Sequence, residues 1–198
     1  MTRTQLINAL YQIKAVKFGQ FKLKSGKISP IYIDLRQIIS YPDVLRSVAN
    51  AIWLMVQEIK FDLICGVPYT ALPVATCISL QHNIPMIMRR KEKKSYGTEQ
   101  QIEGAFHHGQ TCLIIEDLIT TGSSIIETAD DLEAHGLKIT DTALLIDREQ
   151  GGKENLEKRH YRVHAVFTLS EILQTLMKSD RITQEEEVLI KKLLQEPV

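Results

Sequence analysis

The sequence predicts an α/β fold in which a central, mostly parallel sheet is flanked by helices. From residue 61 onward, short apolar runs alternate with segments whose apolar residues have helical spacing. Near-continuously apolar runs are typical of strands covered on both faces, and their alternation with helices indicates parallel pairing. The predicted strands are FDLICG (61–66), PMIMR (85–89), TCLIIED (111–117), ITDTALLID (139–147) and RVHAVFTL (162–169).

The first 60 residues predict two helices and a half-buried strand. Apolar residues at three- and four-residue spacing predict a helix over residues 4–16. In IYIDLR (31–36), isoleucine and leucine alternate with other residues, which is typical of a strand with one buried face. Pro42 favours the first turn of a helix, and the apolar face that follows it extends to Ile59.

Further helices are expected between and after the strands. One begins at about Ala71, and another runs from the turn at 120–124 to His135. Three Ser/Thr-x-x-Glu segments match the capping box, in which two side chains satisfy free N–H groups at a helix start. These segments are Ser124–Glu127, Thr168–Glu171 and Thr183–Glu186, and the last helix is expected to end near Pro197.

Length and charge exclude several classes of protein. The 198 residues suit one domain, which we expect over residues 1–198. The 24 basic and 24 acidic residues cancel, whereas a dedicated nucleic-acid binder needs a long-range positive field. The longest apolar runs are far shorter than the ~20 residues that cross a bilayer. The amino terminus lacks the long apolar core of a signal peptide.

The cysteines and histidines give no sign of a redox or metal site. Cys65, Cys77 and Cys112 lie in apolar sequence without a CxxC pair, so we expect small buried residues in a reducing cytoplasm. His160 and His164 flank a predicted strand, where a four-residue spacing lacks the geometry of a helical metal site. We therefore expect no metal ligation by histidine.

The most informative segment is CLIIEDLITTGSS (112–124). Four apolar residues lead to Glu116 and Asp117, which we place at a strand end, and a hydroxyl-rich turn containing Gly122 precedes a helix. Free N–H groups and the helix dipole make such a turn a cradle for a phosphate, which glycine lets the backbone approach closely. Two adjacent carboxylates can accept hydrogen bonds from vicinal hydroxyl groups and attract Mg²⁺ complexes. The combination predicts a site for a ribose 5-phosphate; the alternative is a tight strand–helix connection with a solvated acidic pair.

This segment resembles the 5-phosphoribosyl-1-diphosphate (PRPP) motif of type I phosphoribosyltransferases. Four further segments are similar to orotate phosphoribosyltransferases, and the similarity is closest to the orotate transferase half of the bifunctional uridine monophosphate synthases of animals. They are LKSGKISPIYIDLR (23–36), CGVPYTALP (65–73), MRRKEKKSYGT (88–98) and LLIDREQGG (144–152). The resemblance implies the type I phosphoribosyltransferase fold, with a small hood region at about 18–36 and a mobile catalytic loop at about 90–104.

The resemblance also implies which residues meet each substrate. The residues implied to bind PRPP are Lys24, Tyr69, Thr70, Arg90, Lys91, Lys94, Tyr96, Glu116, Asp117, Leu118, Ile119, Thr120, Thr121, Gly122, Ser123 and Ser124. The residues implied to bind orotate are Tyr32, Ile33, Thr120 and Arg148. The implied catalytic residues are Arg90, Lys91, Lys94 and Asp117.

The chemistry of the basic residues agrees with these roles. The run RRKEKK (89–94) places cations where a departing diphosphate gathers charge, although such a run also fits a solvated surface loop. The Arg148 guanidinium could bind a carboxylate in bidentate fashion and so distinguish orotate from uracil; the alternative is a salt-bridged loop arginine. Lys24 offers a point charge to oxyanions, or is an exposed loop lysine.

The function that the resemblance implies is transfer of the 5-phosphoribosyl group from PRPP to orotate. The products are orotidine 5′-monophosphate and diphosphate, in pyrimidine biosynthesis. The resemblance also implies Mg²⁺ carried by PRPP and a homodimer with shared active sites. If the chain, which stops at Val198, is a complete gene product, we expect orotidine monophosphate decarboxylase to be a separate protein. A transferase for another base, such as a purine, and a non-catalytic regulator that binds nucleic acid are the alternatives.

Overall fold

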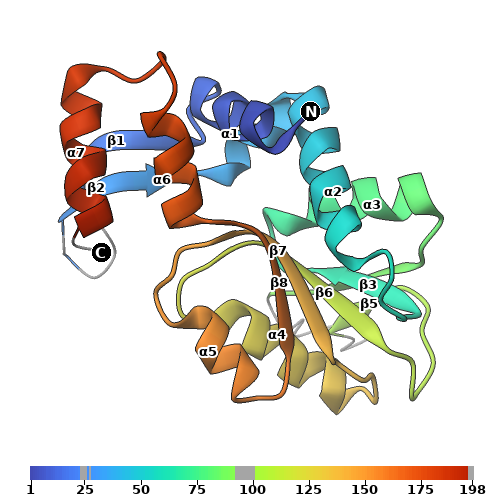
Figure 1. Cartoon of the computed structure of the whole chain (residues 1–198). Helices are drawn as coiled ribbons and strands as arrows, with labels where there is room; N and C mark the ends of the chain where they lie inside the picture. The colour runs from blue at the N-terminus through green and yellow to red at the C-terminus, as the bar shows by residue number, and fades with distance from the viewer. Residues whose placement is uncertain (23–25, 27, 92–100, 196–198) are drawn as a thin grey trace. The chain divides into compact units, whose positions relative to one another are not determined.

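The chain folds into two compact units (Figure 1). The computed structural model describes residues 1–22, 26, 28–91 and 101–195. The hairpin unit comprises Met1–Ser47 and Thr168–Val198, and the sheet unit comprises Val48–Phe167. Helix α2 (Pro42–Val56) begins at the predicted proline and continues from the first unit into the second.

The sheet unit is built on six strands in the order β5-β4-β3-β6-β7-β8. Strand β3 pairs in parallel with β4 and β6, and β6 pairs in parallel with β7, which confirms the predicted fold class. Strand β5 was not predicted, because two residues are too short to show a pattern; it runs antiparallel to β4. The strands are β3 (Leu63–Gly66), β4 (Met86–Arg89), β5 (Ile102–Glu103), β6 (Cys112–Ile119), β7 (Asp141–Asp147) and β8 (Arg162–Thr168).

Helices cover both faces of this sheet. Helix α3 (Ala71–His82) lies on one side, and α4 (Ser123–Ala134) and α5 (Gly152–Glu157) lie on the other (Figure 1). Right-handed crossovers that leave β3 and β6 in opposite directions account for this arrangement. Every residue of β3 and of β7 is buried, as their apolar sequences predict.

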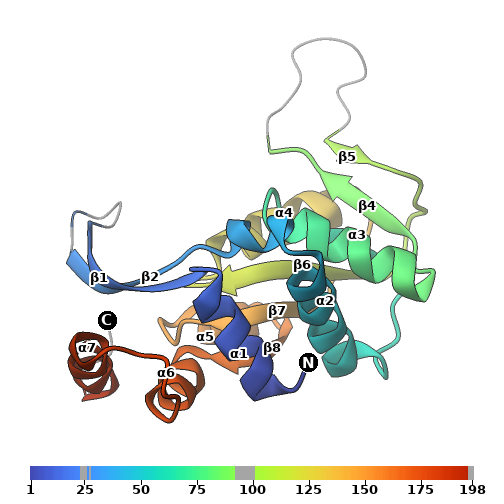
Figure 2. The same ribbon diagram turned by 90° about the horizontal axis from the view of Figure 1, so that it is seen from above.

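The hairpin unit consists of helices packed with a two-stranded antiparallel ribbon (Figure 2). Contacts join α1 to α6, α6 to α7, and α7 to β1. Its elements, besides the start of α2, are α1 (Arg3–Gln12), β1 (Val16–Lys22), β2 (Ile28–Ile33), the 3-10 helix η1 (Leu35–Ser40), α6 (Leu169–Met177) and α7 (Gln184–Gln195).

The sequence-based boundaries near the amino terminus were partly wrong. The predicted helix over 4–16 ends at Gln12, because Lys14 adopts a positive φ of 59° and Val16 already begins β1. The strand expected over 31–36 lies earlier, at 28–33, and η1 follows it. The pattern could not reveal β1, since its side chains are mostly half-buried or exposed and show no clean alternation.

Two of the three predicted capping boxes are confirmed. The hydroxyl of Thr168 accepts from Glu171 N–H at 3.1 Å, and the Thr183 hydroxyl accepts from Glu186 N–H at 3.2 Å. In each case the glutamate side chain in turn accepts a hydrogen bond from the threonine N–H. The expected end of the last helix near Pro197 lies outside the described residues.

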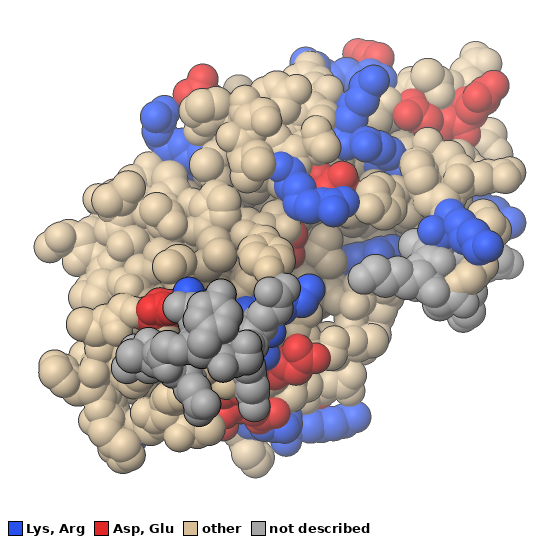
Figure 3. All heavy atoms as spheres, turned by 180° about the vertical axis from the view of Figure 1, so that it is seen from behind, with Lys and Arg blue, Asp and Glu red and all other residues tan. Residues whose placement is uncertain are grey.

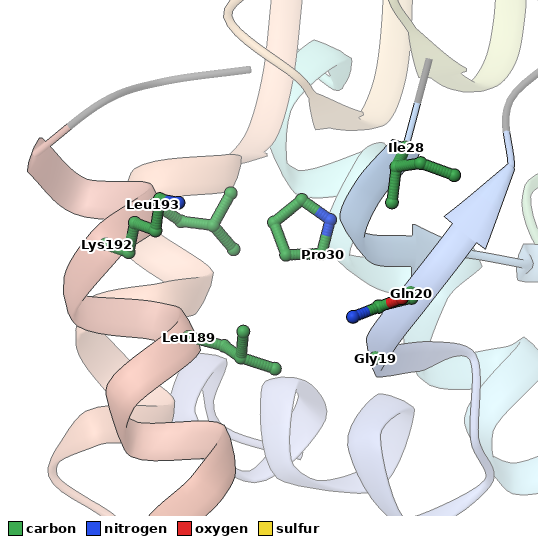
Figure 4. Close-up of a pocket in the computed structure, with 7 residues that line it drawn as sticks. All are labelled: Gly19, Gln20, Ile28, Pro30, Leu189, Lys192 and Leu193. Atoms are coloured by element: carbon green, nitrogen blue, oxygen red, sulfur yellow. The ribbon is translucent and has the colours of Figure 1, made fainter. Parts of the chain in front are cut away.

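An apolar groove of about 530 Å³ lies within the hairpin unit, between α7 and the ribbon (Figure 4). Leu189 and Leu193 of α7 face Ile28 and Pro30 across it. The remaining lining residues are Gly19, Gln20 and Lys192.

None of the three described cysteines forms a disulfide bond with another described residue. Cys65 and Cys112 are buried, as expected, and burial raises the pKa of the Cys65 thiol to about 11. Cys77 is half-buried. Among the described residues, no helix is both long and apolar enough to cross a bilayer.

Candidate active site

The carboxyl ends of the parallel strands define the candidate site. The chain leaves β3 toward β4 on one side and returns to β6 on the other, so β3 and β6 are the point where the strand order reverses. Ligands of open α/β sheets bind at such a point. Because β3, β4, β6 and β7 run parallel, the four loops that follow them meet at the same edge of the sheet.

The hydroxyl-rich turn at 120–124 joins β6 to α4. Gly122 is the N-cap residue of α4, with a φ of 83° that favours glycine. No side chain caps this helix, so the predicted capping box at Ser124 is wrong; the helix already begins at Ser123. The first N–H groups of α4 therefore have no intrahelical acceptor, and they carry the positive end of the helix dipole.

This turn encloses a small hollow of about 30 Å³. The free N–H groups of the turn suit an anion such as a phosphate. The lining residues are Glu116, Leu118, Ile119, Thr120, Gly122, Ser123, Ser124 and Ile125. The hydroxyl groups of Thr121 and Ser123 lie 3.5 Å apart beside it.

Helix α5 supports the turn from behind, which sequence reasoning missed. A Cβ atom at Gly152 would lie 2.5 Å from the Thr120 carbonyl oxygen, and one at Gly122 would lie 3.1 Å from Leu156. Asn155 Nδ2 donates to the Thr121 carbonyl oxygen at 3.1 Å. The adjacent glycines at 151–152 were the available signal, because consecutive glycines after a strand indicate a close backbone approach.

The acidic pair lies inside β6 rather than at its end. Sequence reasoning placed the strand end at Asp117, but the strand continues to Ile119. Glu116 is only 6% exposed, whereas Asp117 is half-buried. Glu116 Oε1 accepts from Asp117 N–H at 2.9 Å. Burial, followed by the neighbouring Asp117 charge, raises the pKa of Glu116 well above its ordinary value.

Arg148 lies directly beside the turn. Its backbone N–H donates to the Ile119 carbonyl oxygen at 3.1 Å, which joins the loop after β7 to the residue preceding Thr120. The guanidinium Nε and Nη2 atoms are buried and have no hydrogen-bond partner in the described part of the chain. Burial lowers the pKa of Arg148, but an arginine stays charged in proteins. A buried, unpaired guanidinium is costly unless an anion binds it.

The loops after β3 and β4 bring two further predicted residues together. Lys91 Nζ lies 5.8 Å from the centre of the Tyr69 ring, a cation–π arrangement. The Thr70 hydroxyl makes no capping bond at the start of α3. Arg90 Nε pairs instead with Glu103 Oε1 at 2.6 Å.

The two predicted base-contacting residues of the hairpin unit face opposite sides of their strand. Ile33 is buried together with Ile31, and Tyr32 points the other way, because successive side chains of a strand alternate. Tyr32 stacks on Phe21 with ring centres 5.4 Å apart, a pairing that the sequence did not reveal. The roles of Tyr32 and Ile33 toward orotate stay predictions. Lys24, Lys94 and Tyr96 lie outside the described residues.

The fold and the site define a class of protein. The chain belongs to the phosphoribosyl transferase domain family, whose model matches residues 35–171. The matched segment includes the acidic pair, the hydroxyl-rich turn and Arg148.

Named relatives narrow that class. The chain is 52% identical to the uridine 5′-monophosphate synthase of Bos taurus over 96% of its own length, and it spans 40% of that protein. It is 43% identical to the orotate phosphoribosyltransferase of Chlamydia caviae, covering 98% of this chain and 95% of the relative. Among solved structures, the UMP synthase of Leishmania donovani superimposes with a TM-score of 0.88 at 38% identity, over 98% of this chain and 42% of that one.

Proposed function

We propose that this chain transfers the 5-phosphoribosyl group from PRPP to N1 of orotate, releasing diphosphate and forming orotidine 5′-monophosphate. The similarity to the chlamydial orotate phosphoribosyltransferase, which extends over nearly the full length of both chains, supports this reaction. The observation that carries the choice of base is Arg148, whose Nε and Nη2 atoms are buried and find no hydrogen-bond partner among the described residues. Orotate supplies the planar carboxylate that such a fork binds.

Each part of PRPP has a matching feature in the sheet unit. The N–H groups and hydroxyls of the 120–124 turn hold the 5-phosphate. Glu116 and Asp117 accept hydrogen bonds from the ribose 2- and 3-hydroxyls. Lys91 and the loop at Tyr69 meet the diphosphate at the ends of β3 and β4. The site therefore fixes the sugar between an anion cradle and a cationic edge.

Magnesium is proposed as the cofactor, carried by PRPP. The residues fit this assignment, since Asp117, with Glu116 beside it, would offer the carboxylate oxygens that attract a hard cation. When bound, Mg²⁺ supplies positive charge to the departing diphosphate.

Catalysis needs positioning and charge rather than a protein nucleophile. Orotate N1, which gives up its proton to solvent, attacks the anomeric carbon while the bond to the diphosphate breaks, so positive charge develops on the sugar and negative charge on the leaving group. Cations near the diphosphate stabilise this transition state more than the ground state. We propose Arg90, Lys91 and Lys94 for this role, and Asp117 for the sugar side.

A direct assay tests the reaction. The purified chain should consume orotate, measured by the loss of its absorbance, and the loss should require both PRPP and Mg²⁺. Lys94→Ala should lower kcat far more than it weakens PRPP binding. Absence of turnover at saturating PRPP and Mg²⁺ would reject the proposal.

The two alternatives predict different results. A purine transferase would consume a purine in preference to orotate, and it would leave the Arg148 guanidinium without a carboxylate partner. A nucleic-acid-binding regulator would bind RNA or DNA in a salt-sensitive way without turnover. The charge distribution does not favour nucleic-acid binding, because the described basic and acidic side chains on the face in Figure 3 lie interspersed and the chain has no net charge.

We propose further that the enzyme is a homodimer with shared active sites and that it resides in the cytoplasm. Leu54 of α2 and Leu80 of α3 are 65% and 80% exposed, and an assembly would cover such apolar side chains. The two helices are held together by Trp53 and His82, whose rings stack with centres 3.9 Å apart. A reducing compartment agrees with the lack of disulfide bonds among the described cysteines. The product is the substrate of a decarboxylase, which is the partner activity that we expect.

A further inference from the structure

A single carboxylate on α4 binds both ends of the segment that separates β4 from β5. Asp131 Oδ2 accepts from Arg89 Nε at 2.5 Å and from Gln101 Nε2 at 2.6 Å. Arg89 is the last residue of β4, and Gln101 immediately precedes β5. The proposed catalytic cations Arg90, Lys91 and Lys94 belong to the stretch of chain between these two anchors.

Backbone pairing completes this clamp. Arg90 N–H donates to the Gln101 carbonyl oxygen at 2.8 Å, and the antiparallel register places Arg89 opposite Ile102. Arg90 also pairs with Glu103, as described above. The side chains of Arg89 and Asp131 are 12% and 25% exposed, so solvent and salt screen this ion pair less than they screen an exposed one.

The position of Asp131 connects the clamp to the phosphate cradle. Helix α4 begins at the 120–124 turn, and Asp131 lies eight residues after its first residue, Ser123. At about 1.5 Å of rise per residue, a rigid helical rod of roughly 12 Å separates the cradle from the clamp. The first residues of α4 lie at the proposed 5-phosphate site. Asp131, in the second half of α4, contacts the two residues that flank the cation-bearing segment.

We propose that Asp131 is a positioning residue for phosphoribosyl transfer, which holds Arg90 and Lys91 in place relative to the phosphate cradle. The expected effect on kcat rests on the proposed function, whereas the contacts of Asp131 with Arg89 and Gln101 do not depend on it. Asp131 acts through Arg89 and Gln101 and touches neither substrate. Displacement of a diphosphate-binding cation should slow the reaction, because a misplacement of about 1 Å can lower a rate by about 100-fold.

The test compares Asp131→Asn with a matched neighbour. Asparagine keeps the size of the side chain but removes the charge shared by both donors. The control is Asp130→Asn, which removes an ion pair with Arg159 on the other side of the same helix turn. The measurements are kcat, the KM for orotate, PRPP affinity by calorimetry, Tm, and hydrogen exchange of the Arg90 amide.

Asp131→Asn should lower kcat by about tenfold or more, with orotate KM and PRPP affinity within twofold of the parent and Tm close to that of the control. The Arg90 amide should exchange at least about tenfold faster, because its bond to Gln101 loses its anchor. Asp131→Glu, which restores the charge, should recover part of the lost kcat. Asp130→Asn should match the parent in rate and in exchange.

Three results would overturn the inference. They are a kcat for Asp131→Asn within twofold of the parent, an equal loss in the Asp130→Asn control, or a loss of activity explained by a fall in Tm. Failure of the proposed function gives a different signature. The parent itself would then not consume orotate, while exchange of the Arg90 amide would still report whether Asp131 holds the clamp.

Discussion

At position 152, one added carbon atom would collide with the phosphate cradle. The Cβ of an alanine there would lie 2.5 Å from the Thr120 carbonyl oxygen, and that oxygen belongs to backbone rather than to a flexible side chain. The turn or α5 must therefore shift if Gly152 is replaced. At the residue scale, the absence of a side chain is what lets α5 support the turn.

We predict that Gly152→Ala weakens PRPP binding by about 10- to 100-fold, because the turn loses the geometry that presents its N–H groups. Calorimetric titration with PRPP measures the effect. Glu154→Ala, an exposed change on the same helix, is the control and should bind PRPP like the parent. Equal affinities for the parent and Gly152→Ala would show that the turn does not depend on α5.

Arg148 determines the choice of base in our proposal. Arg148→Ala should raise the KM for orotate by about 100-fold, because the carboxylate loses a bidentate charge-assisted partner. PRPP affinity should change by less than about threefold, which separates this effect from damage to the cradle. Steady-state kinetics with each substrate varied in turn is the measurement. Arg159→Ala, at an exposed pair with Asp130, is the control; an unchanged orotate KM in Arg148→Ala would contradict the assignment.

Among the elements, β7 and β8 are tied at their starts by a buried carboxylate, at the end of the strands away from the site. Asp141 accepts from Arg162 through both oxygens, at 2.8 and 2.7 Å, and from His164 Nε2 at 2.7 Å. Burial alone would raise the pKa of Asp141, but the hydrogen bonds from Arg162, His164 and Thr140 outweigh it and lower the pKa to about 2. The cluster therefore stabilises the sheet in the charged form.

This cluster makes a prediction about stability and pH. Because the folded-state pKa of Asp141 is lower than the unfolded value, its contribution is present above about pH 5 and is lost as the pH falls toward 2. Asp141→Asn should cost about 2 kcal/mol at pH 7, and the loss relative to the parent should shrink as the pH approaches 3. Thermal unfolding followed by circular dichroism from pH 7 to 3 is the measurement.

The control for this prediction is an exposed ion pair. Asp43→Asn removes the contact between Asp43 and Arg46, whose side chains are 88% and 60% exposed, and should change Tm little at any pH. A pH-independent difference between the parent and Asp141→Asn would show that the cluster does not stabilise the fold through its charge. Orotate turnover at pH 7 should be unaffected by either variant at temperatures below Tm.

For the whole molecule, the proposed shared site predicts complementation between two impaired variants, assayed at an orotate concentration near the parent KM. Lys94→Ala lacks a loop cation and Arg148→Ala lacks the base anchor. If the loop of one subunit serves the pocket of the other, a mixed dimer has one pocket in which both residues are intact. Equal mixing with full subunit exchange should restore about a quarter of the parent activity, since half of the dimers are mixed and each has one intact site. No recovery after verified exchange would show that each loop serves its own subunit.

Some features of this protein were determined by local sequence. The apolar runs at 61–66 and 139–147 could be recognised as buried strands because burial on both faces demands apolar side chains throughout. The hydroxyl-rich turn at 120–124 could be recognised because glycine and a helix start within a few residues are enough to make an anion cradle. Both rest on interactions between residues close together in the chain.

Other features were decided only by the tertiary structure. Glu116 is buried within its strand, α5 presses on the turn across about 30 residues of chain, and Asp131 gathers Arg89 and Gln101 from two places. No spacing in the sequence encodes these contacts, because each depends on which strands become neighbours and on how closely the backbones approach. The residue types that make up the site could therefore be predicted from the sequence. The contacts that position them, from α5 and from Asp131, arise from long-range packing.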